Sequence, residues 1–291
     1  MTAAPAPRRP LRLWAARGSG NLTHFHPSLR PRRTDDPILE PAMSPPVYDW
    51  DAGEYLTSEE ERMIDELEAM LRPPVLPMAP YPPKAVLLAS GETMVVRQAS
   101  VDEVDTMLEV IQPLSWLARD FYDIVAARLF AELLGWKTHR VRNEYCLVGV
   151  IDGVLAGIVN GRLWDEKHGV SYHTLTLKRG LRVGSHLFAS KMEHHIEYLG
   201  QDEVWIVAES PIGHRRWMIE YPLDQKFEVQ HELGGAPAWV LTRDTYFKAK
   251  SRLVTGSRPV SPELLAGSYP LRKPDLKVML TQIEHTLEAR L

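Results

Sequence analysis

Cysteine is almost missing from this sequence, since Cys146 is the only one in 291 residues. A single thiol excludes an internal disulfide framework and any site built from paired cysteines. An excess of basic residues is missing too, because the formal net charge is −4 and the pI is near 6.3. Proteins that bind nucleic acid usually carry such an excess. We therefore expect a cytoplasmic protein that has no nucleic-acid partner.

Long apolar runs are also missing. No run approaches the roughly 20 apolar residues that cross a bilayer, and the N-terminus has no continuous apolar core of a signal peptide. Neither a membrane partner nor secretion is expected. A hydrophobic content of 44% is normal for a globular protein and is enough for one domain with extensions.

Several catalytic motifs are not present. The chain has no G-x-S-x-G elbow, no Walker lysine after a glycine-rich loop and no G-x-G-x-x-G fingerprint. His194 and His195 are adjacent, so they point to different parts of a helix surface, and His24 and His26 lie in an N-terminal arm. Neither pair makes a metal site with nearby acids. No metal is expected.

Composition divides the N-terminal part of the chain. Residues 1–56 are predicted to form a disordered or extended arm. Its Arg- and Pro-rich stretch, residues 1–42, has three interpretations: an organellar transit peptide, a disordered segment, or residues that precede a natural start at Met43. Residues 57–92 are predicted to form an amphipathic helix and an extended linker, because six prolines fall between positions 73 and 85.

The rest of the chain is predicted to form a folded domain, residues 93–248, and a C-terminal extension, residues 249–291, with a helix near 274–291. In the domain, Asp152-Gly153 joins two β-type runs and is the dipeptide favoured in a two-residue type I′ hairpin. A third run, VSYHTLTL (170–177), leads through a loop into a helical segment. The predicted order of elements is β-α-α-β-β-β-α-β-α-β-β.

The loop after that third run is RGLRVG, followed by SHL. Together with the order of elements, it resembles the signature Q/R-x-x-G-x-G/A of the GNAT superfamily of acyl-CoA N-acyltransferases. Arg179, Gly180, Val183, Gly184 and Leu187 match the form RGKGVG-x-x-L, whereas Arg182 replaces the middle glycine. The resemblance covers residues 93 to 244.

The resemblance implies an α/β (α+β) fold. Its centre would be a mixed, mostly antiparallel sheet of about six or seven strands with helices on both faces, joined here by the N-terminal arm and the C-terminal helical extension. The implied function is transfer of an acetyl or other acyl group from acetyl-CoA to a primary amine of a small molecule or of a protein lysine or N-terminus. The alternative is a non-catalytic member of the same fold that senses coenzyme A or binds proteins.

The resemblance also implies which residues bind coenzyme A. The diphosphate would lie on the loop and the helix N-terminus, where backbone N–H groups are unpaired, and the strand before the loop would offer its backbone to the pantetheine and the carbonyl. Arg182 is either a substitute cation for the phosphate or a sign that the loop has lost its ligand. If its backbone needs a positive φ, it costs on the order of 1 kcal/mol. The implied cofactor-binding residues are Leu175, Thr176, Leu177, Arg179, Gly180, Leu181, Arg182, Val183, Gly184 and Ser185.

An amine acceptor is mostly protonated at neutral pH, so the reaction needs a base. Glu209 is the candidate base, directly or through water, and is otherwise a solvated residue before a helix capped by Ser210. Tyr221 is the candidate acid for the departing thiolate. His173 is a second candidate base, or else a strand histidine that is satisfied in the core or at the surface. Edge strands and the two terminal amphipathic helices favour a homodimer.

Overall fold

The computed structural model describes residues 58–71, 75–118, 121–207, 210, 213, 220–221, 223–230 and 237–288. The predicted arm, residues 1–56, lies outside these ranges. So do the candidate base Glu209 and most of the helix predicted between Pro211 and Tyr221.

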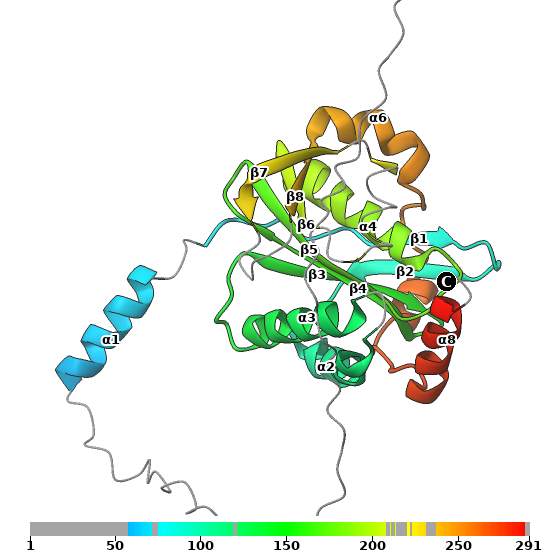
Figure 1. Ribbon diagram of the computed structural model, residues 1–291, viewed down its shortest axis with the longest axis horizontal. Coiled ribbons are helices and arrows are strands. Elements are labelled where there is room, and N and C mark those ends of the chain that lie inside the picture. The colour runs from blue at the N-terminus through cyan, green and yellow to red at the C-terminus, as the bar shows by residue number, and fades with distance from the viewer. Residues whose placement is uncertain are drawn as a thin grey trace, which may run out of the picture. The chain divides into compact units, whose positions relative to one another are not determined.

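A mixed sheet of eight strands forms the centre of the fold (Figure 1), in the order β1-β2-β3-β4-β5-β6-β8-β7. Neighbouring strands are antiparallel except β5 and β6, which are parallel. The predicted mixed, mostly antiparallel sheet is therefore confirmed. The strands are β1 (Lys84–Leu87), β2 (Thr93–Gln98), β3 (Glu144–Ile151), β4 (Val154–Leu163), β5 (His168–Thr176), β6 (Glu203–Val207), β7 (Asp224–Gln230) and β8 (Pro237–Thr242).

Strand β1 is one more than the sequence predicted. It follows the proline-rich segment, which was expected to be an extended linker, and pairs with β2 at the edge of the sheet. Prolines are tolerated next to an edge strand because one side of that strand needs no partner. Lys84 and Val86 point inward, and both are buried.

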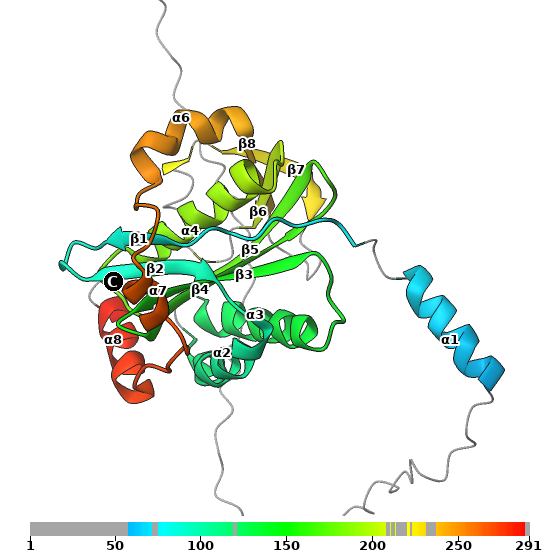
Figure 2. The ribbon, with the colours of Figure 1, turned by 180° about the vertical axis from the view of Figure 1, so that it is seen from behind.

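Helices cover both faces of the sheet (Figures 1 and 2). One apolar cluster combines residues of α2, α3 and α8 with one face, and another combines α4 and α6 with strands β6 and β8. The helices are α1 (Ser58–Leu71), α2 (Val104–Ile111), α3 (Tyr122–Lys137), α4 (Val183–Glu193), α6 (Arg243–Leu253), α7 (Pro262–Gly267) and α8 (Leu276–Glu288), with short 3₁₀ turns at Val101–Glu103 and Gln112–Trp116 and a π turn at His194–Tyr198.

Helices α3 and α6 differ from the predictions. Helix α3 was expected to begin near Trp116, but it begins at Tyr122, because the preceding turn is 3₁₀ and Phe121 adopts a left-handed conformation with φ 58°. Helix α6 was not predicted. Thr242 caps it by accepting a hydrogen bond from the N–H of Thr245, and it crosses the expected domain boundary at residue 248.

The hairpin between β3 and β4 is the one that the sequence predicted. Asp152 and Gly153 both have positive φ, 49° and 78°, as a type I′ turn requires. The C-terminal extension packs beside this hairpin, because the N–H of Leu155 donates to the carbonyl of Arg272 at 2.9 Å.

Helix α1 carries the apolar stripe that the sequence predicted, but this stripe is not buried. Met63, Ile64 and Leu67 are 53%, 42% and 49% exposed. In the part of the chain that the structure describes, no helix has both the length and the apolar composition to cross a bilayer.

The π turn that extends α4 contains two fully buried histidines. The ring of Tyr145 on β3 packs edge-on against both, with centroids 4.5 Å from His194 and 5.3 Å from His195. Burial lowers the pKa of His194 to about 4 and the pKa of His195 to about 3. Both imidazoles are therefore neutral at pH 7.

Acid should unfold the protein partly through these histidines. Their folded-state pKa values are below the unfolded value of about 6.5, so the stability is complete above that pH and is lost as the pH falls toward 4. We expect a loss of about 1 kcal/mol per pH unit for each histidine. Urea unfolding at pH 7, 6 and 5 measures it.

The variant His194→Phe provides the control, since it keeps the aromatic packing and removes one proton site. Its stability should fall less steeply than the wild type between pH 6.5 and 5. The comparison between variants is needed because Glu144 acts in the opposite direction: burial raises its pKa, so it holds a proton in the folded state. Equal slopes in the two proteins would contradict the assignment to His194.

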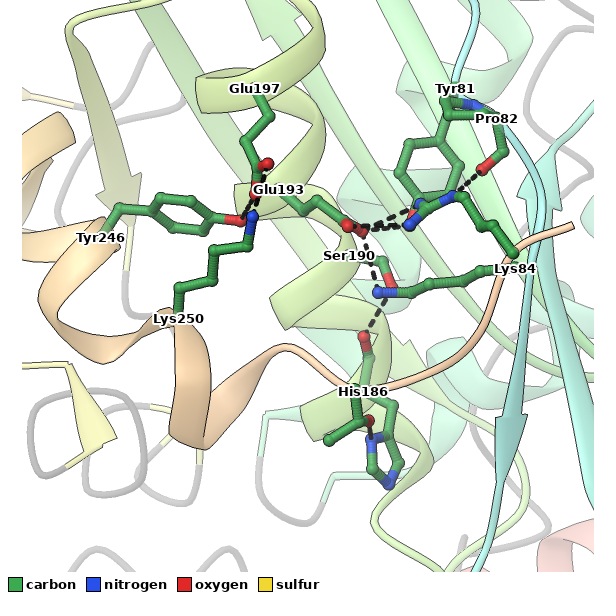
Figure 3. A network of polar contacts seen from close by, with 11 residues as sticks. Tyr81, Pro82, Lys84, His186, Ser190, Glu193, Glu197, Tyr246 and Lys250 are labelled. Atoms are coloured by element: carbon green, nitrogen blue, oxygen red, sulfur yellow. Dashed lines mark hydrogen bonds and ion pairs between the residues drawn. The ribbon is translucent and has the colours of Figure 1, made fainter.

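Glu193 on α4 joins both chain extensions to the domain (Figure 3). Its carboxylate accepts hydrogen bonds from Tyr81 Oη at 2.7 Å, Lys84 Nζ at 2.8 Å, and Arg258 Nη1 and Nη2 at 2.9 and 3.1 Å. Burial alone would raise the pKa of Glu193, but Arg258 and Lys84 outweigh it and hold this pKa at about 2. The segments before β1 and after α6 are thus tied to one buried anion.

Candidate active site

The loop between β5 and α4 has the geometry of an anion-binding turn. Gly180 and Arg182 have positive φ, 87° and 61°, and α4 begins at Val183. The first N–H groups of a helix have no acceptor within it, and the side chain of Arg182 does not cap them. The N–H groups of Val183, Gly184 and Ser185, together with the positive end of the helix dipole, can therefore bind an anion.

The side chain of Ser185 adds a further donor at the same place. Its hydroxyl oxygen is buried and has no hydrogen-bond partner in the described part of the chain. Buried polar atoms are usually satisfied, so an unpaired hydroxyl beside a helix N-terminus fits a ligand that carries oxygen atoms. The predicted loop residues, from Arg179 to Ser185, therefore fit a diphosphate.

The backbone of Arg182 has the positive φ that was expected to reduce the stability of the fold. Its backbone is left-handed (φ 61°, ψ 20°), a conformation that costs a residue with a Cβ on the order of 1 kcal/mol. Its guanidinium is 57% exposed and lies 3.1 Å from Glu220 Oε1. The cation is thus held at the loop by a carboxylate.

The substitution Arg182→Gly should stabilise the protein relative to Arg182→Ala. Both variants remove the cation and its pair with Glu220, but only glycine relieves the left-handed backbone. We expect a difference of about 0.5–1 kcal/mol in the free energy of unfolding, measured in urea. Equal stabilities would show that the loop leaves this conformation at no cost.

Gly184 lets α4 approach β5 closely. A Cβ at this position would lie 2.4 Å from Thr176 Oγ1, well inside van der Waals contact, although 3.7 Å from Thr176 Cβ. The glycine of the motif thus sets the distance between the helix N-terminus and the last residue of β5.

Next to this loop, strand β5 has no strand partner on its β6 side among the residues that the structure describes. Its pairing with β6 ends at Ser171 and Ile206, so the two strands part beyond this point. On its other side β5 stays paired with β4, and the N–H of Leu177 donates to Ala156 O at 2.9 Å. Backbone groups alternate along a strand, so the N–H groups of Thr174 and Thr176 face the opening between β5 and β6.

The same opening is bordered by the start of α3. Tyr122 Oη donates to the carbonyl of Thr176 at 2.8 Å, and the guanidinium of Arg179 lies 4.8 Å from the Tyr122 ring centroid. Phe121, immediately before, has a left-handed backbone. Strained non-glycine residues cluster at functional sites, and here Phe121 and Arg182 lie on the two segments that meet at Thr176 and Arg179.

A buried polar cluster lies where β5 leaves β6. His173 Nε2 is 3.0 Å from Glu132 Oε1, and Asn160 Nδ2 donates to Glu132 Oε2 at 2.5 Å and to Glu144 Oε1 at 3.0 Å. Asn160 Oδ1 accepts the backbone N–H of His173 at 3.0 Å. A β-bulge causes this arrangement, because Val159 pairs with Thr174 while Gly161 pairs with Ser171. The bulge turns His173 toward α3.

Two carboxyl groups share this cluster but differ in exposure. Glu144 is 3% exposed, and burial, reinforced by the nearby Glu132, raises its pKa. The side chain of Glu132 is 14% exposed. Two ionised carboxylates this close repel each other, and Glu144 is the one whose pKa is raised.

A lysine lies under the same part of β5. Lys191 of α4 is fully buried, and its Nζ donates to the carbonyl of His173 at 2.9 Å and lies 3.5 Å from Thr174 Oγ1. The cation therefore contacts the bulge from the face opposite to α3. It adds positive potential where the strands part.

The structure describes only one of the two residues predicted to act in catalysis. Glu209 lies outside the described residues, so its role stays a prediction. Tyr221 is 2% exposed, its ring is 5.4 Å from the ring of Phe188, and its hydroxyl is buried without a partner in the described residues. Burial raises its pKa, so the phenol is neutral and can donate a proton. His173 is buried and paired with Glu132, which is compatible with both of its interpretations, and its role as a base stays a prediction.

The sequence reasoning missed Glu132, Asn160 and Lys191. Each interrupts an apolar pattern: Glu132 is three residues after Leu129 on the buried stripe of α3, and Lys191 is four residues after Leu187 on the buried face of α4. Asn160 ends the apolar alternation of β4. A polar residue at a position that the period assigns to the core was the available signal.

Comparisons with known proteins give fold relatives only. No protein-family model matches the sequence, and no curated protein matches it either. Solved structures include an uncharacterized protein of Bacillus halodurans (12% identity, 59% of this chain and 96% of that chain, TM-score 0.45) and Mycobacterium smegmatis RimJ in complex with CoA-disulfide (8%, 60% and 97%, 0.43). The PaiA N-acetyltransferase of Thermoplasma acidophilum in complex with coenzyme A is another (12%, 51% and 98%, 0.39). The fold assignment itself rests on the strand order and the loop.

Proposed function

We propose that this protein is an acyl-CoA-dependent N-acyltransferase that transfers an acetyl or other acyl group to a primary amine. The observation that carries the proposal is the continuous path formed by the β6-side edge of β5 and the N-terminus of α4. Polar backbone groups along that edge suit the amides of pantetheine, and the helix N-terminus suits a diphosphate.

Each residue has a place in this proposal. Val183, Gly184 and Ser185 would hold the diphosphate through their N–H groups, and Arg179 and Arg182 would add charge. Of the three N–H groups proposed for the pantetheine and the thioester carbonyl, that of Leu177 is bonded to Ala156, whereas that of Thr176 faces the opening. Thr176 is the donor we favour for the ligand.

Removal of the proton from the amine and protonation of the thiolate complete the reaction. Glu209, as base, and Tyr221, as acid, remain our proposals for these steps. The acceptor is a small-molecule amine or a protein lysine or N-terminus. We further propose a cytoplasmic protein that acts as a homodimer, without metal, nucleic-acid or membrane partners.

A non-catalytic coenzyme A sensor is the second candidate, and one observation favours it. The guanidinium of Arg182 is paired with Glu220, which reduces its value as a cation for phosphate. A sensor needs the same loop but no acceptor site.

Calorimetric titration with acetyl-CoA and with free coenzyme A tests both candidates. The enzyme should bind acetyl-CoA with a micromolar Kd and release free thiol when a primary amine is added. Binding without thiol release, for any primary amine, supports the sensor. No binding of either ligand overturns both.

A further inference from the structure

Glu132 is held as a single oriented carboxylate. Each of its oxygens has its own partner, His173 Nε2 for Oε1 and Asn160 Nδ2 for Oε2. His173 is fully buried, whereas Glu132 keeps 14% of its side chain exposed. An ionised group with two fixed partners and one open side can receive a cation from that side.

The position of this carboxylate suits the transfer reaction. His173 is in the bulge, two residues beyond Ser171, the last residue of β5 that pairs with β6. The carboxylate thus lies on the α3 side of the point where the strands part. The proposed diphosphate seat is at the other end of the same strand edge, at Gly184.

We propose that Glu132, in place of Glu209, binds the ammonium group of the acceptor and takes its proton, and that His173 and Asn160 are positioning residues for this carboxylate. This inference rests on the proposed function. It assigns to the acceptor the class of primary aliphatic amines, which are cations at neutral pH.

The proton balance is complete without a further reactant. Glu132 removes one proton from the ammonium, and the freed nitrogen lone pair forms the C–N bond to the thioester carbonyl. When the C–S bond breaks, Tyr221 gives a proton to the thiolate and regains one from the nitrogen, and Glu132 returns the first proton to water. The products are an amide, a thiol and one released proton.

Two nucleophiles of nearly the same size distinguish a general base from a residue that only supports the fold or binds the cofactor. Methylamine is an ammonium ion at pH 7.5 and needs a base, whereas hydroxylamine is already neutral there. Glu132→Gln should lower the rate of thiol release from acetyl-CoA with methylamine by about 100-fold or more and leave the rate with hydroxylamine within a few-fold. His173→Gln should reduce the methylamine rate about 10-fold.

Glu109→Gln is the matched control, because it makes the same change at an exposed carboxylate of α2 that pairs with Lys273 and lies outside the proposed site. Its rates should equal those of the wild type. Acetyl-CoA titration of all variants shows whether the cofactor site is intact.

The pH profile provides a second readout. The charged groups around Glu132 and His173 are Glu144 of β3 and Lys191 of α4, and Arg162 of β4 acts on Glu144. In Glu132→Gln the methylamine rate should rise in proportion to the fraction of free amine, because no base then removes the proton, and in the wild type it should rise less steeply with pH.

Each of the remaining outcomes contradicts either the role of Glu132, the acceptor class or the proposed function. If Glu132→Gln lowers both rates equally, or neither, the role of Glu132 is overturned while the proposed function stands. If the wild type releases thiol with hydroxylamine but not with methylamine, the assignment to an ammonium acceptor is overturned. If the wild type does not bind acetyl-CoA, it is the proposed function that fails.

Discussion

Gly184→Ala should weaken binding of acetyl-CoA by about 100-fold. Gly184 does not have a positive φ, so alanine introduces no backbone strain and acts only through its Cβ, which would lie 2.4 Å from Thr176 Oγ1. The N-terminus of α4 must then move away from β5, and at least two charge-assisted hydrogen bonds to the diphosphate lose their geometry. At about 1.5 kcal/mol each, these bonds account for roughly 100-fold in Kd. Calorimetric titration with acetyl-CoA measures the change.

The double variant Gly184→Ala with Thr176→Ala tests this explanation. It removes the hydroxyl that clashes and leaves the 3.7 Å contact to the Cβ of residue 176, so affinity should return to within a few-fold of the wild type. Thr176→Ala alone should bind normally. Undiminished affinity in Gly184→Ala would show that this loop does not hold the diphosphate.

Glu193→Ala should destabilise the fold by about 3–5 kcal/mol, the cost of breaking a buried ion pair from one side. Lys84 is 1% exposed, and its ammonium would lose the carboxylate that it contacts at 2.8 Å. Arg258 and Tyr81 would lose the same partner (Figure 3). The midpoint of urea unfolding is the measurement.

An apolar replacement of the pair is the informative control. Glu193→Leu combined with Lys84→Met removes both buried charges, and stability should recover much of the loss, because well-packed apolar residues often match a buried ion pair. Glu197→Gln, one helical turn away, keeps hydrogen-bonding capacity toward Tyr246 and should cost less than Glu193→Ala. If Glu193→Ala unfolds at the wild-type midpoint, Glu193 does not anchor the two extensions.

Local signals account for the parts of the fold that the sequence predicted well. The Asp152-Gly153 turn depends on two adjacent residues that accept positive φ, and the strands and helices around it depend on apolar periods of two and 3.6 residues. The resemblance to the GNAT motif located the loop because its glycines and its place between a strand and a helix are short-range features. These features could be predicted without any knowledge of tertiary contacts.

The predictions that were wrong or incomplete depend on distant contacts. Strand β1 forms because β2 has an edge with which it can pair. Neither the prolines before β1 nor its own four residues indicate that such an edge exists. Helix α3 begins late because of the left-handed Phe121, whose neighbour Tyr122 bonds to Thr176, 54 positions away. A propensity for helix cannot include such a contact.

From the sequence alone, this protein could be described as a mixed sheet with an anion-binding loop at Arg179 to Ser185, because those features depend on neighbouring residues. Only the tertiary structure brought together the residues that we propose for the acceptor side. Glu132, Asn160 and His173 come from one helix and two strands, and a bulge in β5 brings them together. Folding places such groups by burial and packing over long separations, which a linear pattern does not record.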